Sequence, residues 1–479
     1  MLKFVRVAVN VAQISGTFDY ELPARLEGLV KPGSLVVVPF GKQLSQGIVM
    51  AEISEPAVPE IKQIADLVDP LPVVTQLQLR LAAFMAEQNL TSVAECLEPM
   101  LPPGLSQHAD TLVHLLMPHV EESFTSLQLR IIALLQERGD MRGRQLDTAF
   151  PHVNWRASLA GLVKHGAVST QPILLPPSIH PKQIRTVVLS KPLAEASSIL
   201  QNPGSGRHTQ GNVLARRQAV LSLLAQEAAP VDVSLVYAET GTSLADLQAI
   251  AKLELISLGE SEFWRDPLRT MDLPLQSPPA LTPGQSAVWK VLEPQFNKPG
   301  PRNLNLLVGV TGSGKTELYL RAVAAVLDQG KQAIVMVPEI ALTPQTVRRF
   351  YARFPGKVAL VHSRLSPGER YDSWRRIRSG SLPVVVGARS ALFSPVPDLG
   401  LIVIDECHDE SYFQDDFRPH YSAVDTAIAC ARLANVPLLL GSATPNVEQI
   451  YQARREKWHE LRLPDRILAH QTAEETHEA

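Results

Sequence analysis

Hydrophobic and polar positions follow two different periods along the first hundred residues. Apolar residues alternate with polar ones through residues 1–72, most clearly from Leu35 to Ile53, which predicts a small antiparallel β domain. From Gln76 to Leu97 the apolar positions change to helical spacing. We therefore expect a β domain with a linking helix over residues 1–105.

Two later segments share one pattern of short amphipathic helices. From Leu127 to Ser169, and again from Arg216 to Glu260, three helical periods are followed by strand-like residues. Three short helices that close on a hairpin are typical of a winged helix. We predict a winged-helix domain over residues 106–175 and a second winged-helix-like region over residues 176–270. Winged helices bind DNA in some proteins and pack only against protein in others, so both interpretations stay open for each segment.

The pattern changes again at about residue 271. Short apolar runs now alternate with helical segments, which indicates a parallel sheet with helices on its faces. The fold class we predict is α/β and multidomain: an N-terminal β domain, a winged-helix-like middle and a parallel-sheet lobe over residues 271–479. The runs are LNLLVGV, QAIVMVP, LPVVVGA, GLIVIDE and VPLLLGS.

Composition narrows the class of protein. The chain of 479 residues is 45% hydrophobic and 19% charged, with a formal net charge of −3, so any nucleic-acid contact must use local basic patches. No apolar run approaches the roughly 20 residues that span a bilayer, so we expect no membrane association. The three cysteines, Cys96, Cys407 and Cys430, form no CxxC pair, which argues against a disulfide framework or a cysteine zinc site. A reducing cytoplasm fits this cysteine usage.

The first strand of the lobe leads into a phosphate-binding sequence. Residues 309–316, GVTGSGKT, fit the pattern GxxxxGK[ST] and lie between a strand and a helix, as a P-loop requires. Glycines let backbone N–H groups surround phosphates, Lys315 reaches the β and γ phosphates, and the Thr316 hydroxyl binds Mg²⁺. The residues expected to bind ATP here are Gly309, Val310, Thr311, Gly312, Ser313, Gly314, Lys315 and Thr316.

Two acids end a later apolar run. Residues 401–404 lead to Asp405 and Glu406, which places both carboxylates at the carboxyl edge of the sheet. We expect Asp405 to hold Mg²⁺ through water and Glu406 to polarise the water that attacks the γ phosphate. The acids that follow, Asp409 and Glu410, fit a solvated loop instead.

Further motifs choose among the P-loop classes. The tetrapeptide DECH resembles the DEAH-type box of superfamily 2 helicases, and GSATP, residues 441–445, resembles their motif III. The resemblance places Gln285 of LTPGQ where such helicases read adenine. It also implies that VPEIALTPQ and GARSALFSP grip the phosphates of one strand, with Arg389 as a phosphate-binding cation.

In combination, these motifs closely resemble those of the replication-restart helicases of the PriA family. TFDYELP, PGSLVVVPFGKQ and EIKQI resemble that family's domain for binding a DNA 3′ end. The resemblance implies that Phe18, Asp19, Gly41 and Lys62 line the pocket for the terminal nucleotide. Without it, Phe18 would be assigned to the core and Lys62 to the surface.

The resemblance also assigns roles in the helicase lobe, whose fold it implies is RecA-like. The implied catalytic residues are Lys315, Thr316, Asp405, Glu406 and His408, and Ser442 and Thr444 are implied to couple hydrolysis to strand movement. The implied cofactors are ATP and Mg²⁺. No zinc is expected in this chain, because the family's cysteine-rich insert and second lobe follow motif III and are not in this sequence.

The function implied is replication restart at stalled or collapsed forks. The complete family member binds forked DNA with a 3′ end and single-stranded DNA, unwinds 3′ to 5′ and assembles the primosome in the bacterial cytoplasm, at the nucleoid. Implied partners are primosome proteins, single-stranded DNA-binding protein and the replicative helicase loader. Two alternatives stay open for this chain: a fork-binding scaffold with impaired catalysis, and a fragment without an independent role.

Overall fold

A computed structural model describes most of the chain, which divides into two compact units. One unit combines Met1–Ile179 with Pro267–Ala479, and the other is His180–Asp266. No helix in the described part is long and apolar enough to cross a membrane. The described residues are 3–11, 16–41, 43–102, 104–105, 109–116, 124–151, 153–174, 179–201, 211–227, 229–269, 271, 273–297 and 303–467.

The N-terminal residues form the predicted antiparallel β domain. Its five strands lie in the order β2-β1-β4-β3-β5, and every neighbouring pair is antiparallel. Side chains alternate in burial over the first part of β1, where Val5 and Val7 are completely buried and Arg6 between them is partly exposed. The strands are β1 (Lys3–Val9), β2 (Thr17–Leu22), β3 (Leu35–Phe40), β4 (Gln43–Ile53) and β5 (Asp66–Leu67).

The predicted linking helix is two helices, α1 (Gln76–Gln88) and α2 (Val93–Leu97). Between them Leu90 has a positive φ of 50°, which a continuous helix does not allow. The second helix starts at a capping box, in which Ser92 and Glu95 satisfy each other's backbone N–H groups. The apolar spacing continues across the break, whereas the first helix ends at its C-cap residue, Asn89.

The two middle segments have the same topology. Each folds as a three-stranded antiparallel sheet whose first strand is central, in the orders β7-β6-β8 and β10-β9-β11. The first has β6 (Ala109–Leu115), α3 (Ser126–Arg138), β7 (Met141–Arg142), α4 (Gly143–Ala149), α5 (Trp155–Lys164) and β8 (Val168–Leu174). The second has β9 (Lys182–Leu189), α6 (Leu193–Gln201), α7 (Gly211–Gln226), β10 (Val231–Asp232), α8 (Val233–Thr240), α9 (Leu244–Ala251) and β11 (Ile256–Phe263).

This topology differs from the expected closing hairpin. The last strand of each segment pairs with the strand that precedes its helices, β8 with β6 and β11 with β9. The pairing brings together residues more than fifty positions apart, as in Ala109 with Leu174, so a local pattern could not indicate it. The repeat itself is present in the fold.

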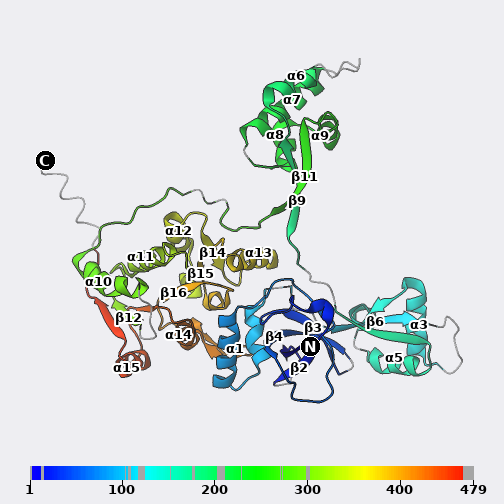
Figure 1. Cartoon of the computed structure of the whole chain (residues 1–479), viewed down its shortest axis with the longest axis horizontal. Coiled ribbons are helices and arrows are strands. Elements are labelled where there is room, and N and C mark those ends of the chain that lie inside the picture. Colours follow the sequence, from blue (N-terminus) through cyan, green and yellow to red (C-terminus); the bar gives the residue numbers. More distant parts are fainter. Residues whose placement is uncertain are drawn as a thin grey trace. The chain divides into compact units, whose positions relative to one another are not determined.

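The remaining residues build the predicted parallel sheet. Its seven strands lie in the order β14-β15-β13-β16-β19-β12-β20, all parallel, with helices packed against it (Figure 1). The strands are β12 (Leu304–Gly309), β13 (Gln332–Met336), β14 (Val358–Val361), β15 (Val384–Gly387), β16 (Leu399–Ile404), β19 (Leu438–Ser442) and β20 (His459–Leu463). The helices are α10 (Pro283–Asn297), α11 (Lys315–Leu327), α12 (Pro344–Arg353), α13 (Pro367–Arg378), α14 (Ala423–Ala434) and α15 (Val447–Arg455). Short elements between them include the 3₁₀ helices η4 (Arg389–Phe393) and η5 (Glu410–Tyr412) and the strands β17 (Phe413–Gln414) and β18 (Tyr421–Ser422).

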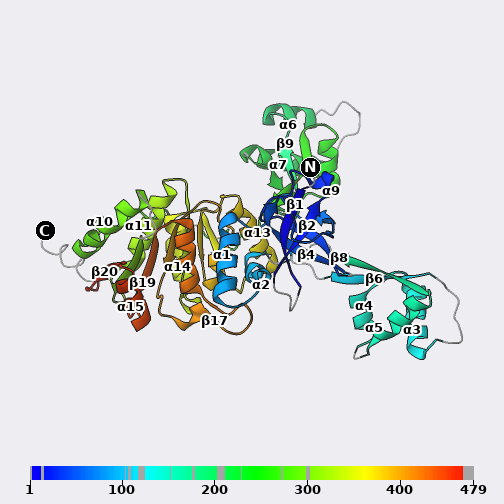
Figure 2. The ribbon, with the colours of Figure 1, turned by 60° about the horizontal axis from the view of Figure 1, so that its bottom comes forward.

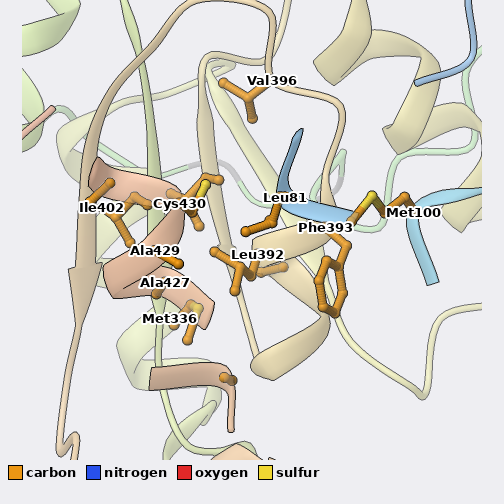
Figure 3. Close-up of a cluster of buried hydrophobic side chains, with 14 of the residues drawn as sticks. Leu81, Met100, Met336, Leu392, Phe393, Val396, Ile402, Ala427, Ala429 and Cys430 are labelled. Carbon is orange, nitrogen blue, oxygen red and sulfur yellow. The ribbon is translucent and has the colours of Figure 1, made fainter. Parts of the chain in front are cut away.

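Helix α1 packs against this lobe and shares its core. It lies beside α14 (Figure 2), and Figure 3 shows Leu81 of α1 next to Leu392 of η4. The Gln78 side chain is buried and its Nε2 donates a 2.8 Å hydrogen bond to the Phe393 carbonyl. The β domain and the lobe are therefore joined through a buried surface, in addition to the chain connection.

Candidate nucleotide and DNA sites

The P-loop connects β12 to α11 with the geometry its glycines allow. Gly312 and Gly314 have φ values of +84° and +81°, in the region that L side chains rarely adopt. A Cβ on Gly309 would lie 2.7 Å from Ser313 Oγ, so a side chain there would displace the Ser313 hydroxyl. Lys315 is the first residue of α11, so its backbone N–H and those just before it lie at the helix N-terminus, where phosphate binding stays a prediction.

Gln285 lies beneath the P-loop and contacts its backbone. The side chain is 2% exposed, and its Nε2 donates to the carbonyls of Ser313 (3.4 Å) and Gly314 (3.3 Å). Its Oε1 accepts from the backbone N–H of Thr282 and so caps α10. In this structure Gln285 supports the shape of the P-loop; a contact to adenine stays a prediction.

Strand β16 delivers Asp405 and Glu406 to the same edge of the sheet as the P-loop. Lys315 Nζ lies 3.1 Å from Glu406 Oε1 and donates to the Gly309 carbonyl. Glu406 itself has a positive φ of 43°, an uncommon conformation for a residue with a side chain and typical of functional sites. Burial raises the pKa of Asp405, and the charge of Glu406 raises it further.

The DECH box and motif III are in direct contact. His408 Nδ1 lies 2.7 Å from Ser442 Oγ, and the backbone N–H of Ala443 donates to Glu406 Oε2. The backbone N–H of Thr444 donates to Ser442 Oγ, while the Thr444 side chain is exposed. The structure thus brings His408 and Ser442 together, while a coupling role for Ser442 and Thr444 stays a prediction.

Two buried tyrosines donate hydrogen bonds to Asp405. The sequence analysis did not predict either of these contacts. The Tyr319 hydroxyl donates to Asp405 Oδ1 at 2.9 Å, and the Tyr412 hydroxyl donates to the Asp405 carbonyl at 2.8 Å. Burial raises the pKa of both phenols well above the ordinary value, so they are neutral donors at neutral pH. Tyr319 follows Lys315 by four residues on one helix, a spacing that could have indicated it.

The P-loop and the two acids line one cleft of about 510 Å³. Residues of the strap before α10, including Gln276 and Pro279, and of α12, including Arg349, complete its walls. Positive-φ glycines, a buried lysine, the Thr316 hydroxyl and a carboxylate are a suitable donor set for a nucleotide phosphate with Mg²⁺. No group of three or more His, Cys, Asp or Glu side chains in the described residues is arranged to hold a metal by itself. Mg²⁺ needs only one or two protein ligands when phosphates supply others.

Arg389 contacts the protein backbone in this structure. Its Nη1 donates to the carbonyls of Phe413 (2.7 Å) and Ser411 (3.3 Å), on either side of Tyr412. These bonds connect the GARSALFSP motif to the segment that holds Asp405. A DNA phosphate contact by Arg389 stays a prediction.

A second pocket, of about 360 Å³, lies in the N-terminal β domain, and all four predicted residues line it: Phe18, Asp19, Gly41 and Lys62. Phe18 is half-buried and packs edge-to-face against Phe40 with ring centroids 5.0 Å apart. Lys62 Nζ donates to the Gly41 carbonyl at 3.1 Å. The pocket therefore combines an aromatic surface with a cation and a carboxylate.

Arg6 also lines this pocket, and the sequence interpretation missed it. Arg6 lies opposite Asp19 in the β1–β2 register, and its Nε and Nη2 donate to the two carboxylate oxygens at 2.9 and 3.3 Å. Ala57 N–H donates to Asp19 as well. The guanidinium bond lowers the pKa of Asp19. Pairing the first two predicted strands as an antiparallel hairpin would have placed Arg6 opposite Asp19 and so could have indicated this ion pair.

Comparison with known proteins agrees with this geometry. Residues 282–453 match the DEAD/DEAH box helicase family. The lobe is therefore a helicase domain of the class that uses ATP. Residues 6–102 match the 3′DNA-binding domain (3′BD) of PriA.

Two relatives are similar to this chain over almost its whole length. The chain is 33% identical to the replication restart protein PriA of Bacillus subtilis (strain 168), over 97% of this chain and 56% of that protein. It is 34% identical to PriA of Synechocystis, over 96% of this chain and 54% of that protein. Over the part that it spans, the chain is therefore similar to the replication restart proteins of the PriA family. It spans about half the length of these curated relatives.

Among solved structures, part of the chain is similar to RecG bound to a three-way DNA junction. The identity is 25% and the TM-score 0.30, over 40% of this chain and 25% of RecG.

Proposed function

We propose that this chain binds DNA forks through a 3′ end and hydrolyses ATP in its helicase lobe, as part of replication restart. The observation that carries the proposal is the convergence of Lys315, Asp405 and Glu406 on one cleft, in a chain that also has a 3′DNA-binding domain. In a full-length protein of this family, hydrolysis would drive 3′-to-5′ unwinding and precede primosome assembly.

The residues of the cleft suit distinct tasks in hydrolysis. Lys315 would neutralise the β and γ phosphates, and Thr316 and Asp405 would hold Mg²⁺, the latter through water. When bound, Mg²⁺ supplies positive charge against the charge that develops on the phosphates. Glu406, next to Lys315 and held by the Ala443 N–H, would orient the attacking water.

The N-terminal pocket suits the terminal nucleotide of a DNA strand. The Phe18 ring offers a stacking surface, Asp19 can accept from a 3′ hydroxyl, and Lys62 can contact a phosphate. Gly41 has a positive φ of +59° and leaves open space where a side chain would stand. The requirement for a free hydroxyl would direct the protein to forks with an unblocked 3′ end.

Coupling between DNA and ATP would use the contacts of the DECH box. Arg389 holds the backbone on both sides of Tyr412, and Tyr412 holds Asp405. A DNA phosphate that attracted Arg389 would compete with these carbonyls and change the support of Asp405. His408 and Ser442 form the second connection, to motif III.

The proposed partners follow from the family. They are single-stranded DNA-binding protein, primosome proteins and the replicative helicase loader, at the nucleoid in the bacterial cytoplasm.

Steady-state ATP turnover tests the proposal. The 479-residue chain is assayed with and without a fork that has a free 3′ end, beside Lys315→Ala. We expect turnover that the fork stimulates and that Lys315→Ala abolishes, with fork binding retained. Fork binding with turnover at background would overturn the catalytic part and favour a scaffold. Equal binding of forks with free and blocked 3′ ends would overturn the pocket assignment.

A further inference from the structure

The environment of Asp405 shows how its carboxylate is oriented. Oδ1 accepts from the Tyr319 hydroxyl at 2.9 Å and from the Glu406 N–H at 3.1 Å. Within the described part of the chain, no hydrogen bond is found to Oδ2. Because Oδ1 has two donors from the protein, the carboxylate can offer Oδ2 to a ligand in the cleft without rotating.

The Tyr319 hydroxyl fills the space left by the missing side chain of Gly441, a glycine of motif III. The side chain is 1% exposed, so its hydroxyl needs an acceptor in the protein, and Asp405 supplies it. A Cβ on Gly441 would lie 1.7 Å from the Tyr319 hydroxyl and 2.8 Å from Cζ. Gly441 is in β19, so three segments meet here: the helix after the P-loop, the end of β16 and the start of motif III.

We propose that Tyr319 is a positioning residue for the metal-binding carboxylate and that Gly441 is required because it admits the Tyr319 hydroxyl. The inference rests on the proposed nucleotide function of this cleft and adds two residues to it. Tyr319 would act through Asp405, by holding Oδ1 so that Oδ2 accepts a hydrogen bond from a water of the Mg²⁺ shell. Its loss should therefore weaken the response to Mg²⁺ more than the binding of nucleotide.

The test is a Mg²⁺ titration of nucleotide binding to the full chain. A fluorescent ATP analogue is bound first in EDTA and then at increasing Mg²⁺, for wild type, Tyr319→Phe and Tyr371→Phe. Tyr371 is a buried tyrosine on α13 that does not line the cleft, so its variant controls for loss of a hydroxyl. For Tyr319→Phe we expect a nucleotide affinity in EDTA within about twofold of the wild-type value. We expect the Mg²⁺ concentration that produces half of the change in nucleotide affinity to be about five- to tenfold higher, because one hydrogen bond is removed.

The outcomes separate the inference from the proposed function. If the wild type binds no nucleotide, or binds it without regard to Mg²⁺, the proposed function fails. If wild type responds to Mg²⁺ and Tyr319→Phe responds identically, the positioning role is refuted. Equal weakening in EDTA and in Mg²⁺ would also refute it, because that result indicates a nucleotide contact or general damage.

A double-mutant cycle tests the role of Gly441 by stability. Gly441→Ala is made in wild type and in Tyr319→Phe, and the unfolding midpoint of each variant is measured. Because the hydroxyl is the nearest obstacle, we expect the alanine to lower the midpoint less in the Tyr319→Phe background. Identical decreases in both backgrounds would show that Gly441 does not serve the hydroxyl.

Discussion

Tyr412→Phe tests the connection between the DNA-binding motif and the ATP site. The substitution deletes the hydroxyl that donates to the Asp405 carbonyl at 2.8 Å and keeps the ring, which is 2% exposed. One neutral hydrogen bond contributes about 1 kcal/mol, and a buried carbonyl left without its donor raises the loss to about 3 kcal/mol. We therefore expect the free energy of unfolding to fall by about 1–3 kcal/mol.

The loss of this hydrogen bond should also reduce catalysis if Tyr412 couples DNA binding to ATP hydrolysis. About 1.4 kcal/mol corresponds to a tenfold change, so fork-stimulated turnover should fall about tenfold while turnover without DNA changes less. The assay is steady-state ATP hydrolysis with and without a fork, together with denaturant unfolding. Tyr421→Phe is the matched control: its ring is 3% exposed, it packs against Phe393, and the described residues show no hydrogen bond to its hydroxyl. Unchanged stimulation in Tyr412→Phe, or an equal loss in Tyr421→Phe, would refute the reasoning.

Three further predictions concern stability and thiol chemistry. Leu81→Ala should lower the free energy of unfolding by about 2–5 kcal/mol, because the Leu81 side chain is 1% exposed and packs between α1 and the lobe. Leu71→Ala, at a side chain that is 57% exposed, should change this free energy by about 0.5 kcal/mol or less. Equal effects of the two variants in denaturant unfolding would contradict the shared core. The pKa of Asp19 is lowered in the folded state, so its ion pair with Arg6 stabilises the β domain at pH values above the unfolded-state pKa. This stabilisation is lost as the pH falls through the folded-state pKa, so Asp19→Asn should flatten that part of the acid-unfolding curve. An unchanged curve would exclude the ion pair as its cause. All three thiols should resist an aromatic disulfide reagent until the protein unfolds, because burial raises each pKa to about 12; rapid labelling of the native protein would contradict the buried positions of Cys96, Cys407 and Cys430.

In the two middle segments, the sequence pattern predicts helices but not the pairing of the strands. Helical periodicity indicated α3 to α5 and α7 to α9 and their repetition, because a helix is specified by residues three and four apart, but it did not indicate α6. The strand pairing was wrong, since β6 and β8 are separated by the helices that they enclose. In the same way, the apolar spacing of residues 76–97 did not show the break at Leu90, which lies just before the capping box that starts α2.

The amino-acid sequence alone determined the parts of this protein that depend on local order. The P-loop glycines, the acids after β16 and the alternating residues of the β domain each lie within a few positions of one another, and their roles follow from backbone conformation and strand direction. Only the tertiary structure brought together Tyr319, Asp405 and Gly441, which are far apart in the chain: the Tyr319 hydroxyl donates to Asp405 and fills the space where a Gly441 side chain would lie. Such contacts depend on the order of strands in a sheet and on the volume left by a missing side chain, and neither is encoded in any single stretch of sequence.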